Sequence, residues 1–423
     1  MATIERIHTP SPPSLRHEIA HIYAHSPYYK RLLDAHQISP SDITTLDTLR
    51  RIPVTTKADL QEYNDDFIAV PRHEIIDYVT TSGTLGDPVT FALTDGDLDR
   101  LARNEASSFT VAGCRPTDII QLMTTIDRRF MAGLAYFLGA RALGCGIVRT
   151  GNGIPELQWD TIRRIHPTTC IVVPSFLLKL VEYAKANGID HHTSSLRRAI
   201  CIGEPLRTPE GKYNSLGSRI HEAWPELELH STYASTEMQS SFTECSAHHG
   251  CHIPTDLIIV ELLDEHDQPV AEGEVGEVVI TTLGVRGMPL VRFKTGDLSI
   301  ADHTPCSCGN HSPRLSSILG RKGQMIKYKG TTLYPPALYD ILDNIPDVVN
   351  YIIELYTGEL GTDQITVKIG SARHDERFEK EMKDLFRAKV RVAPEICFEP
   401  IDLISKKQRP ETSRKAIKFF DLR

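Results

Sequence analysis

Three short segments of the sequence bring together residue types that could bind a nucleotide. The first, TTSGTLGDP over residues 80–88, follows a strand-like run and contains Gly83 and Gly86. Glycines let a backbone approach a ligand closely, and successive N–H groups can form an anion-binding nest, so this loop suits a triphosphate. The loop also carries the hydroxyl donors Thr81, Ser82 and Thr84. It lacks the GK[ST] ending of a Walker loop, and an ordinary polar turn is the alternative.

The second and third segments add a carboxylate each. STYASTEMQ, over residues 231–239, places Glu237 in a loop with an aromatic ring and hydroxyls. A carboxylate of this kind can bind Mg²⁺, which takes one or two carboxylates together with phosphates and water. FKTGDLS places Asp297 after a turn glycine, where its carboxylate can accept both hydroxyls of a ribose. Taken singly, each segment is also explained as a polar loop or a turn aspartate.

Cysteines and histidines form two further clusters, CSAHHGCH over residues 245–252 and CSC over residues 306–308. This is not a standard zinc-finger spacing, but two short ligand pairs are enough for a closed tetrahedral zinc site with a structural role. The predicted ligands are Cys245, His252, Cys306 and Cys308, with Cys251 or His249 as alternatives. The competing interpretation is reduced surface cysteines and solvated histidines. The remaining cysteines are expected to pack as small apolar residues.

Composition limits the classes of function. The formal net charge is -8, and nucleic-acid binding needs clustered Lys and Arg, so no nucleic-acid partner is expected. No apolar run is long enough to span a membrane, and no secretory signal is visible at the N-terminus. We therefore expect a cytoplasmic protein with reduced cysteines and no membrane partner.

The elements that must position these residues follow from hydrophobic patterns. Residues 14–35 have a helical pattern, and Thr56 is expected to cap a short helix over KADLQEY. From Ile75 onward, strand-like and helical runs alternate, which predicts βαβ units and a mostly parallel sheet. Residues 257–300 are denser in strands and predict a small β-rich subdomain. Past Arg321, a strand, helix, strand, strand, helix, strand pattern predicts a small α+β domain.

The three loops, in this order, resemble the core motifs of the acyl-adenylate-forming superfamily. GEP at residues 203–205 lies where that superfamily places its adenine-contacting loop, and GRKGQMIKYKG at 320–330 resembles its hinge motif. SRKAIKFFDLR at the C-terminus resembles the segment that carries its catalytic lysine. The N-terminal stretch from AHIYAHSPYYKRLL to IPVTTKADL resembles, more narrowly, the phenylacetate–CoA ligase family. The resemblance covers essentially the whole chain.

This resemblance implies an α/β fold in two domains and a reaction. Residues 1–320 would form the large domain, with parallel sheets and the β-rich subdomain, residues 321–325 a hinge, and residues 326–423 a mobile C-terminal α+β domain. The expected activity is ATP- and Mg²⁺-dependent formation of an acyl-adenylate from phenylacetate or a related aryl acid. Transfer to coenzyme A would then give the thioester.

The resemblance also implies roles for single residues. Lys415 would bridge the substrate carboxylate and the α-phosphate, Glu237 would bind Mg²⁺, and Gly330 would line the CoA channel. Tyr136 is expected either in the acyl pocket or in the core. The expected ATP-binding residues are Ser82, Gly83, Thr84, Gly86, Gly203, Glu204, Pro205, Tyr233, Ala234, Ser235, Thr236, Asp297 and Arg321.

Four positions depart from the family pattern: Leu85, Asp87, Gln324 and Arg414. They bear on the details of phosphate contact and hinge motion more than on the reaction. Two rival functions stay open, an adenylating enzyme with an acceptor other than CoA and a nucleotide-binding protein without catalysis. The sequence also leaves a homodimer open, and it does not identify the acid.

Overall fold

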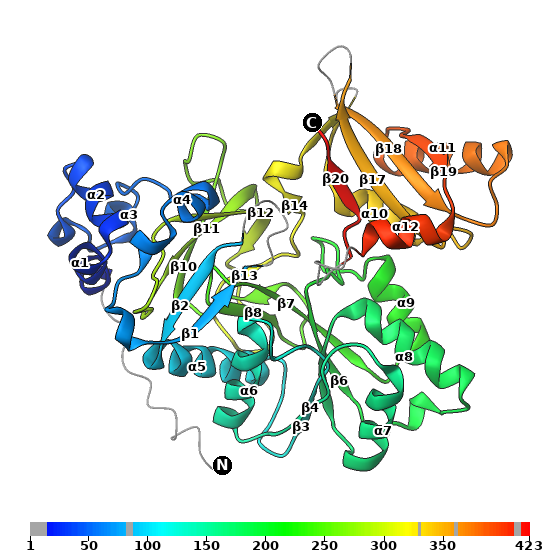
Figure 1. Ribbon diagram of the computed structural model, residues 1–423, viewed down its shortest axis with the longest axis horizontal. Helices are drawn as coiled ribbons and strands as arrows, with labels where there is room; N and C mark the ends of the chain where they lie inside the picture. Colours follow the sequence, from blue (N-terminus) through cyan, green and yellow to red (C-terminus); the bar gives the residue numbers. More distant parts are fainter. Residues whose placement is uncertain (1–14, 82–87, 329–330, 359–362, 410–415) are drawn as a thin grey trace. The chain divides into compact units, whose positions relative to one another are not determined.

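The computed structural model describes residues 15–81, 88–328, 331–358, 363–409 and 416–423 (Figure 1). These residues fall into two compact units. The first lies within Met1–Tyr213, Gly217–Thr295 and Ser299–Ile318, and the second within Asn214–Leu216, Gly296–Leu298 and Leu319–Arg423. The architecture is α/β with a smaller C-terminal unit, which confirms the predicted fold class.

The first unit begins with short helices. The helical pattern of residues 14–35 is divided into α1 (Leu15–His25) and α2 (Pro27–Ala35). The break falls at Ser26, which adopts an extended conformation and accepts a hydrogen bond from the N–H of Tyr29, as an N-cap before a proline does. After α3 (Leu46–Leu49), Thr56 and Asp59 form a capping box at the start of α4 (Lys57–Glu62), which confirms the predicted capped helix.

A run of parallel strands forms the centre of this unit. In spatial order they are β7 (Glu228–Ser235), β6 (Arg198–Ile202), β5 (Thr169–Val172), β3 (Ile119–Leu122) and β4 (Gly146–Arg149). In Figure 1, α5 (Asp95–Val111) and α6 (Met131–Leu143) lie on one side of these strands, and α7 (Pro155–Ile165) and α8 (Pro174–Ala186) on the other. Every residue of β5 is buried, as expected for a strand covered on both faces. The predicted βαβ alternation is confirmed from β3 onward, whereas the strand that begins at Ile75 pairs antiparallel with its neighbour in a separate sheet.

Beyond β7 the sheet becomes antiparallel and forms the predicted β-rich region. The order continues through β8 (Ser240–Glu244), β9 (Cys251–His252), β13 (Arg314–Leu315), β12 (Phe293–Asp302), β11 (Val275–Thr282) and β10 (Ile258–Leu263). Separately, β1 (Ile75–Thr80) pairs with β2 (Thr90–Thr94). Helix α9 covers Ser215–Ala223.

The second unit contains an antiparallel pair and a four-stranded sheet. The sheet has the order β19 (Glu395–Phe398), β18 (Asp363–Gly370), β17 (Asn350–Thr357) and β20 (Phe419–Asp421). Helices α10 (Pro335–Asp343), α11 (Glu376–Val390) and α12 (Ile401–Gln408) belong to the same unit. Strand β14 (Gly320–Arg321) pairs with β12, and β15 (Ile326–Tyr328) pairs with β16 (Thr331–Leu333). Apolar residues such as Ile353, Val367 and Phe386 form its core.

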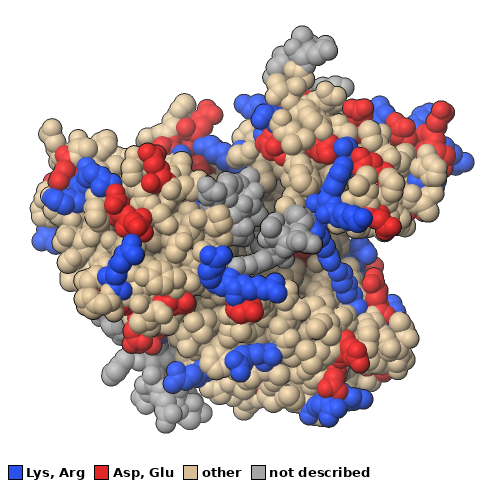
Figure 2. All heavy atoms as spheres, viewed as in Figure 1, with Lys and Arg blue, Asp and Glu red and all other residues tan. Residues whose placement is uncertain are grey.

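The surface carries mixed charge. Acidic and basic side chains are interspersed over the face shown in Figure 2. Among the described helices, none combines the length and apolar character needed to cross a membrane.

Candidate functional site

Two of the predicted nucleotide loops lie side by side at one edge of the parallel sheet. GEP, at residues 203–205, directly follows β6, and STYASTE begins within neighbouring β7. The two strands run parallel, and the last pair in their register is Ile202 opposite Thr232. Gly203 and Tyr233, the next residues, therefore lie at the same height along the two strands. Ligands of open α/β sheets bind outside the carboxyl ends of the strands. The topology therefore brings these two loops to the edge where a ligand is expected.

The GEP loop is held by its own residues. Gly203 has a φ of 78°, a left-handed conformation that a residue with a Cβ adopts only with strain. The Glu204 carboxylate accepts hydrogen bonds from the N–H of Ser175 at 2.8 Å and from its hydroxyl at 3.0 Å. These contacts satisfy the first turn of α8 and fix the loop against that helix. Gly203 and Pro205 are exposed.

The STYASTE segment is partly open to solvent. Ala234 is exposed, while Tyr233, Ser235, Thr236 and Glu237 are half-buried. The ring of Tyr233 meets Phe242 edge-on, with centroids 5.8 Å apart, which fixes one side of the aromatic ring. A half-buried ring at the carboxyl edge of a sheet can stack on a planar base while it keeps its other contacts.

Glu237 contacts Lys57, a residue that is not among the predicted site residues. The ammonium Nζ of Lys57 donates to Glu237 Oε1 at 2.7 Å and to Thr81 Oγ1 at 3.3 Å. Thr81 opens the loop predicted to bind a triphosphate, so the sequence-predicted Glu237 and Thr81 are brought to one lysine. The lysine is 180 residues from Glu237, and no local motif marks such a pairing.

Asp297 and Arg321 come together in the second unit. They face each other across the β12–β14 pair, and Arg321 Nε donates to Asp297 Oδ1 at 3.1 Å. The aspartate side chain is 10% exposed and the arginine 44%. Gly296 before it has a φ of 78°, but it lies within strand β12 and not in the turn that the sequence predicted. The pair predicted to anchor a ribose is thus preassembled by strand pairing.

The other predicted residues divide into two groups. Tyr136 is 2% exposed and belongs to the core cluster around α6, with its ring 6.3 Å from that of Phe109. This position agrees with the prediction that Tyr136 lies in the core. Contact between Tyr136 and an acyl group stays a prediction. Six predicted residues lie outside the described ranges: Ser82, Gly83, Thr84, Gly86, Gly330 and Lys415.

The cysteine and histidine clusters converge. Ligand atoms of Cys245, His252, Cys306 and Cys308 all lie within 4.8 Å of one another. The Sγ atoms of Cys245 and Cys306 are 3.6 Å apart, and Cys308 Sγ is 3.4 Å from His252 Nε2. A tetrahedral zinc site, with Zn–S distances near 2.3 Å, has edges of about 3.8 Å between sulfurs and slightly less between sulfur and nitrogen. These separations fit that geometry and exceed the roughly 2 Å of a disulfide.

The surroundings of this cluster also suit a metal. The Nδ1 atom of His252 lies 3.1 Å from Ser312 Oγ, and a hydrogen bond there orients Nε2 towards the thiols. Burial raises the pKa of the Cys245 thiol to about 12, a cost that a bound cation would remove. The alternative ligands point elsewhere: Cys251 Sγ lies 3.6 Å from the carbonyl of Ser231, and His249 is outside the group.

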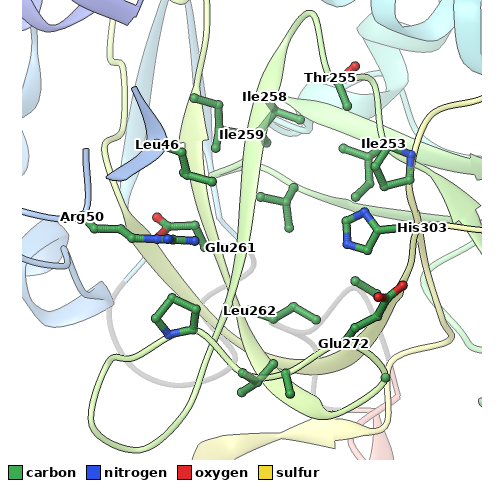
Figure 3. Close-up of a pocket in the computed structure, with 17 residues that line it drawn as sticks. Leu46, Arg50, Ile253, Thr255, Ile258, Ile259, Glu261, Leu262, Glu272 and His303 are labelled. Carbon is green, nitrogen blue, oxygen red and sulfur yellow. The ribbon is translucent and has the colours of Figure 1, made fainter. Parts of the chain in front are cut away.

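A cavity of about 460 Å³ lies elsewhere, along β10 (Figure 3). Its wall is largely apolar, with Ile259 and Leu262 beside Arg50 and Glu261. The carboxylate of Glu261 is paired with Arg50 at 3.4 Å and with Arg292 at 3.1 Å. None of the described residues that line the cavity belongs to a predicted site. The nucleotide loops and this cavity are therefore separate features of the first unit.

Comparison with known proteins identifies relatives over most of the chain. Residues 18–287 match the family model described as AMP-binding enzyme. Phenylacetate–coenzyme A ligase from Thermus thermophilus is 32% identical, over 84% of this chain and 79% of that protein. The Escherichia coli phenylacetate–coenzyme A ligase is 26% identical, over 100% of this chain and 96% of its own.

A solved structure supports the fold independently. The crystal structure of 2-hydroxyisobutyryl-CoA ligase in the postadenylation state, in complex with 2-HIB-AMP, superposes with a TM-score of 0.83 at 22% identity. It covers 100% of this chain and 94% of that chain, and at this identity the likeness establishes the fold alone. Because the family model matches more than half of the chain and a curated relative exceeds 30% identity over most of both proteins, the chain belongs to the phenylacetate–CoA ligase family of AMP-binding enzymes.

Proposed function

We propose that this protein is an ATP-dependent acid–CoA ligase that acts on phenylacetate or a related aryl acid. The observation that carries the proposal is the convergence of the GEP and STYASTE loops at the carboxyl edge of the parallel sheet. That convergence occurs in a chain of the phenylacetate–CoA ligase family. ATP, the acid and CoA are the proposed small-molecule partners.

The chemistry explains what the site must supply. A free carboxylate is a poor acyl electrophile, so its oxygen first attacks the α-phosphorus of ATP and pyrophosphate leaves. The thiol of CoA then attacks the acyl carbon of the adenylate and releases AMP. Positioning of the two anions and stabilisation of charge at phosphorus are the main contributions of the protein.

The proposed roles follow the predicted residues. The GEP loop and Tyr233 would contact the base, and Asp297 with Arg321 would hold the ribose. Residues 82–86 would contact the outer phosphates. Glu237 fits a magnesium ligand because it is a half-buried carboxylate with 15% of its side chain exposed. Bound Mg²⁺ would offset charge on the phosphates.

The C-terminal unit supplies the remaining roles. Lys415 is proposed to bridge the acid and the α-phosphate during adenylation, and Gly330 to line the path of CoA. Residues 321–325 are proposed as the hinge about which residues 326–423 turn between the two half-reactions. In the structure, residues 322–324 form a single 3₁₀ turn between β14 and β15, a short connection that can absorb a change in backbone angles.

We also propose a structural zinc ion at Cys245, His252, Cys306 and Cys308. The support is the convergence of the four ligand atoms within 4.8 Å of one another and the burial of Cys245, His252 and Cys306. Four protein ligands leave no open coordination position, so the ion would hold the β8–β9 and β12–β13 connections together without taking part in the reaction.

A pyrophosphate-release assay with product analysis tests the proposed function. Purified protein would be given ATP, Mg²⁺ and a series of aryl and alkyl acids, with and without CoA, and thioesters would be identified by mass spectrometry. We expect pyrophosphate release with phenylacetate and formation of phenylacetyl-CoA only when CoA is added.

The two rival functions give different results in the same assay. Acyl-adenylate formation without a CoA thioester would mean an adenylating enzyme with another acceptor. Nucleotide binding without pyrophosphate release for any acid would mean a binding protein, and would refute the proposal.

A further inference from the structure

Lys57 occupies a defined position at the edge of the predicted phosphate site. It is the first residue of α4, directly after the N-cap Thr56. The Asp59 carboxylate accepts a hydrogen bond of 2.7 Å from the N–H of Thr56 and completes the capping box. Because the cap fixes the backbone where the side chain begins, the direction of the lysine is set by local structure.

The two partners of Lys57 are both largely buried. Thr81 is 8% exposed, and its hydroxyl accepts a hydrogen bond of 3.0 Å from the N–H of Val89. The Glu237 side chain is 15% exposed, and that of Lys57 is 35% exposed. The ammonium therefore bridges two groups of low exposure, and the lysine side chain is partly open to solvent.

We propose that Lys57 is a phosphate-binding residue that takes the place of the metal on Glu237 while no nucleotide is bound. The inference rests on the proposed function, because it takes Glu237 as the magnesium ligand. An ammonium on a flexible stem has three donors and can leave one acceptor for another within reach. When Mg²⁺ and ATP enter, the metal takes the carboxylate and Lys57 turns to a non-bridging oxygen of the β- or γ-phosphate.

Charge explains the exchange. Among the described residues, Lys57 is the cation paired with Glu237 in the nucleotide-free protein, and a half-buried carboxylate that lost this partner would be costly. Bound ATP adds the negative charge of its phosphates. Mg²⁺ can then pair with Glu237, and Lys57 with a phosphate oxygen. A lysine with this role distinguishes ATP from AMP, because AMP lacks the β- and γ-phosphates. A lysine that only tethers α4 to the first unit makes no such distinction.

Nucleotide binding without turnover tests the assignment. Calorimetry in the absence of any acid would give the Kd of ATP and of AMP, with and without Mg²⁺, for the wild type and Lys57→Ala. We expect ATP to bind about tenfold or more weakly to the variant, the loss of one charge-assisted hydrogen bond, and AMP to bind as in the wild type. Lys57→Gln, which keeps the length of the stem, should behave like the alanine variant.

Lys30→Ala is the matched control. Lys30 lies on α2, another of the short N-terminal helices, and is paired with Asp34 at 3.2 Å on the surface. It should bind both nucleotides normally.

Two results would overturn the inference: equal weakening of ATP and AMP in both Lys57 variants, or wild-type affinity for ATP. Neither depends on the proposed reaction. A wild-type protein that binds ATP but never forms an acyl-adenylate would refute the proposed function, while the contrast between ATP and AMP would still decide the role of Lys57.

Discussion

Asp297 shows how a single side chain can be prepared for a ligand before the ligand arrives. Strand pairing places Arg321 opposite it, and the ion pair at 3.1 Å holds the nearly buried carboxylate in one orientation. Preorganisation of this kind lowers the entropic cost of binding. The same pair makes the predicted ribose contact testable without reference to catalysis.

We expect Asp297→Ala to weaken ATP and AMP binding alike, by about tenfold, because both nucleotides carry the ribose whose hydroxyls would lose their acceptor. Calorimetric Kd values for the two nucleotides would check this. Asp302→Ala, at the other end of the same strand, is the control and should bind normally. A variant that binds AMP as tightly as the wild type would contradict the ribose role.

Glu105 is a buried acid that the proposed mechanism does not use. It lies on α5 with 4% exposure, and burial raises its pKa to about 8. Between the ordinary value of 4.5 and about 8, the unfolded chain loses this proton and the folded chain keeps it. The folded state then binds more protons, so this group makes the protein less stable as the pH rises through that window.

Glu105→Gln should therefore lose less stability than the wild type between pH 5 and pH 9, since an amide does not titrate. Urea unfolding at several pH values would measure the difference. Glu156→Gln, at an exposed position of α7, should follow the wild-type curve. Parallel curves for Glu105→Gln and the wild type would show that Glu105 titrates normally in the folded protein.

At the scale of elements, the zinc proposal concerns two connections that are more than fifty residues apart. Cys245 follows β8, His252 ends β9, and Cys306 and Cys308 lie between β12 and β13. Strands β9 and β13 are only two residues long each, and they pair with Cys251 opposite Leu315. Such short strands add little by themselves, so a metal would be the main constraint on this corner.

Protein purified without added metal should contain about one zinc per chain, and Cys306→Ser should lose both the zinc and several degrees of thermal stability. Elemental analysis and calorimetric melting would measure the two quantities. Cys397→Ser, in the second unit and outside the cluster, is the matched cysteine control. Metal-free protein with an unchanged melting temperature in Cys306→Ser would eliminate the zinc site.

At the scale of the whole molecule, the proposed roles are divided between the two units. The first carries the GEP and STYASTE loops and Glu237. The second contains Arg321 and the C-terminal segment whose lysine, Lys415, is proposed to act only in adenylation. If the second unit turns between the half-reactions, the two steps must depend differently on that lysine.

Lys415→Ala should lose adenylation by roughly 10²–10³, the usual effect of removing one preorganised donor. It should still convert a synthetic acyl-adenylate and CoA to the thioester at close to the normal rate. Pyrophosphate release and thioester formation would be measured separately. Equal loss in both steps would count against a turning domain.

The control for this experiment must be chosen from the structure. Lys418 is close in sequence, but its ammonium contacts Asp343 at 3.2 Å and the Tyr351 hydroxyl at 3.0 Å, so its removal would disturb the second unit itself. Lys406 is exposed on α12. Lys406→Ala should therefore be active in both steps and provides the matched control.

Features of this protein that depend on neighbouring residues could be predicted from its sequence. The α/β class and the capped helix after Thr56 depend on nearby residues and on periodic burial, which a sequence displays directly. The break at Ser26 was missed because the apolar pattern continues through it, although a serine followed by proline is itself a helix-start signal. The GEP loop and Glu237 were found through motifs that keep their residues together.

Tertiary structure alone decided which distant side chains meet. From the sequence, Cys251 and His249 were as available to a metal as Cys245 and His252, and only the folding of β8 and β9 turned Cys251 towards a carbonyl. No sequence motif marked Lys57, because its ion-pair partner lies 180 residues away and the two residues share no local spacing pattern. Periodicity and motifs report interactions along the chain, whereas the partners of a charge or a metal ligand are set by packing between elements, which no local pattern encodes.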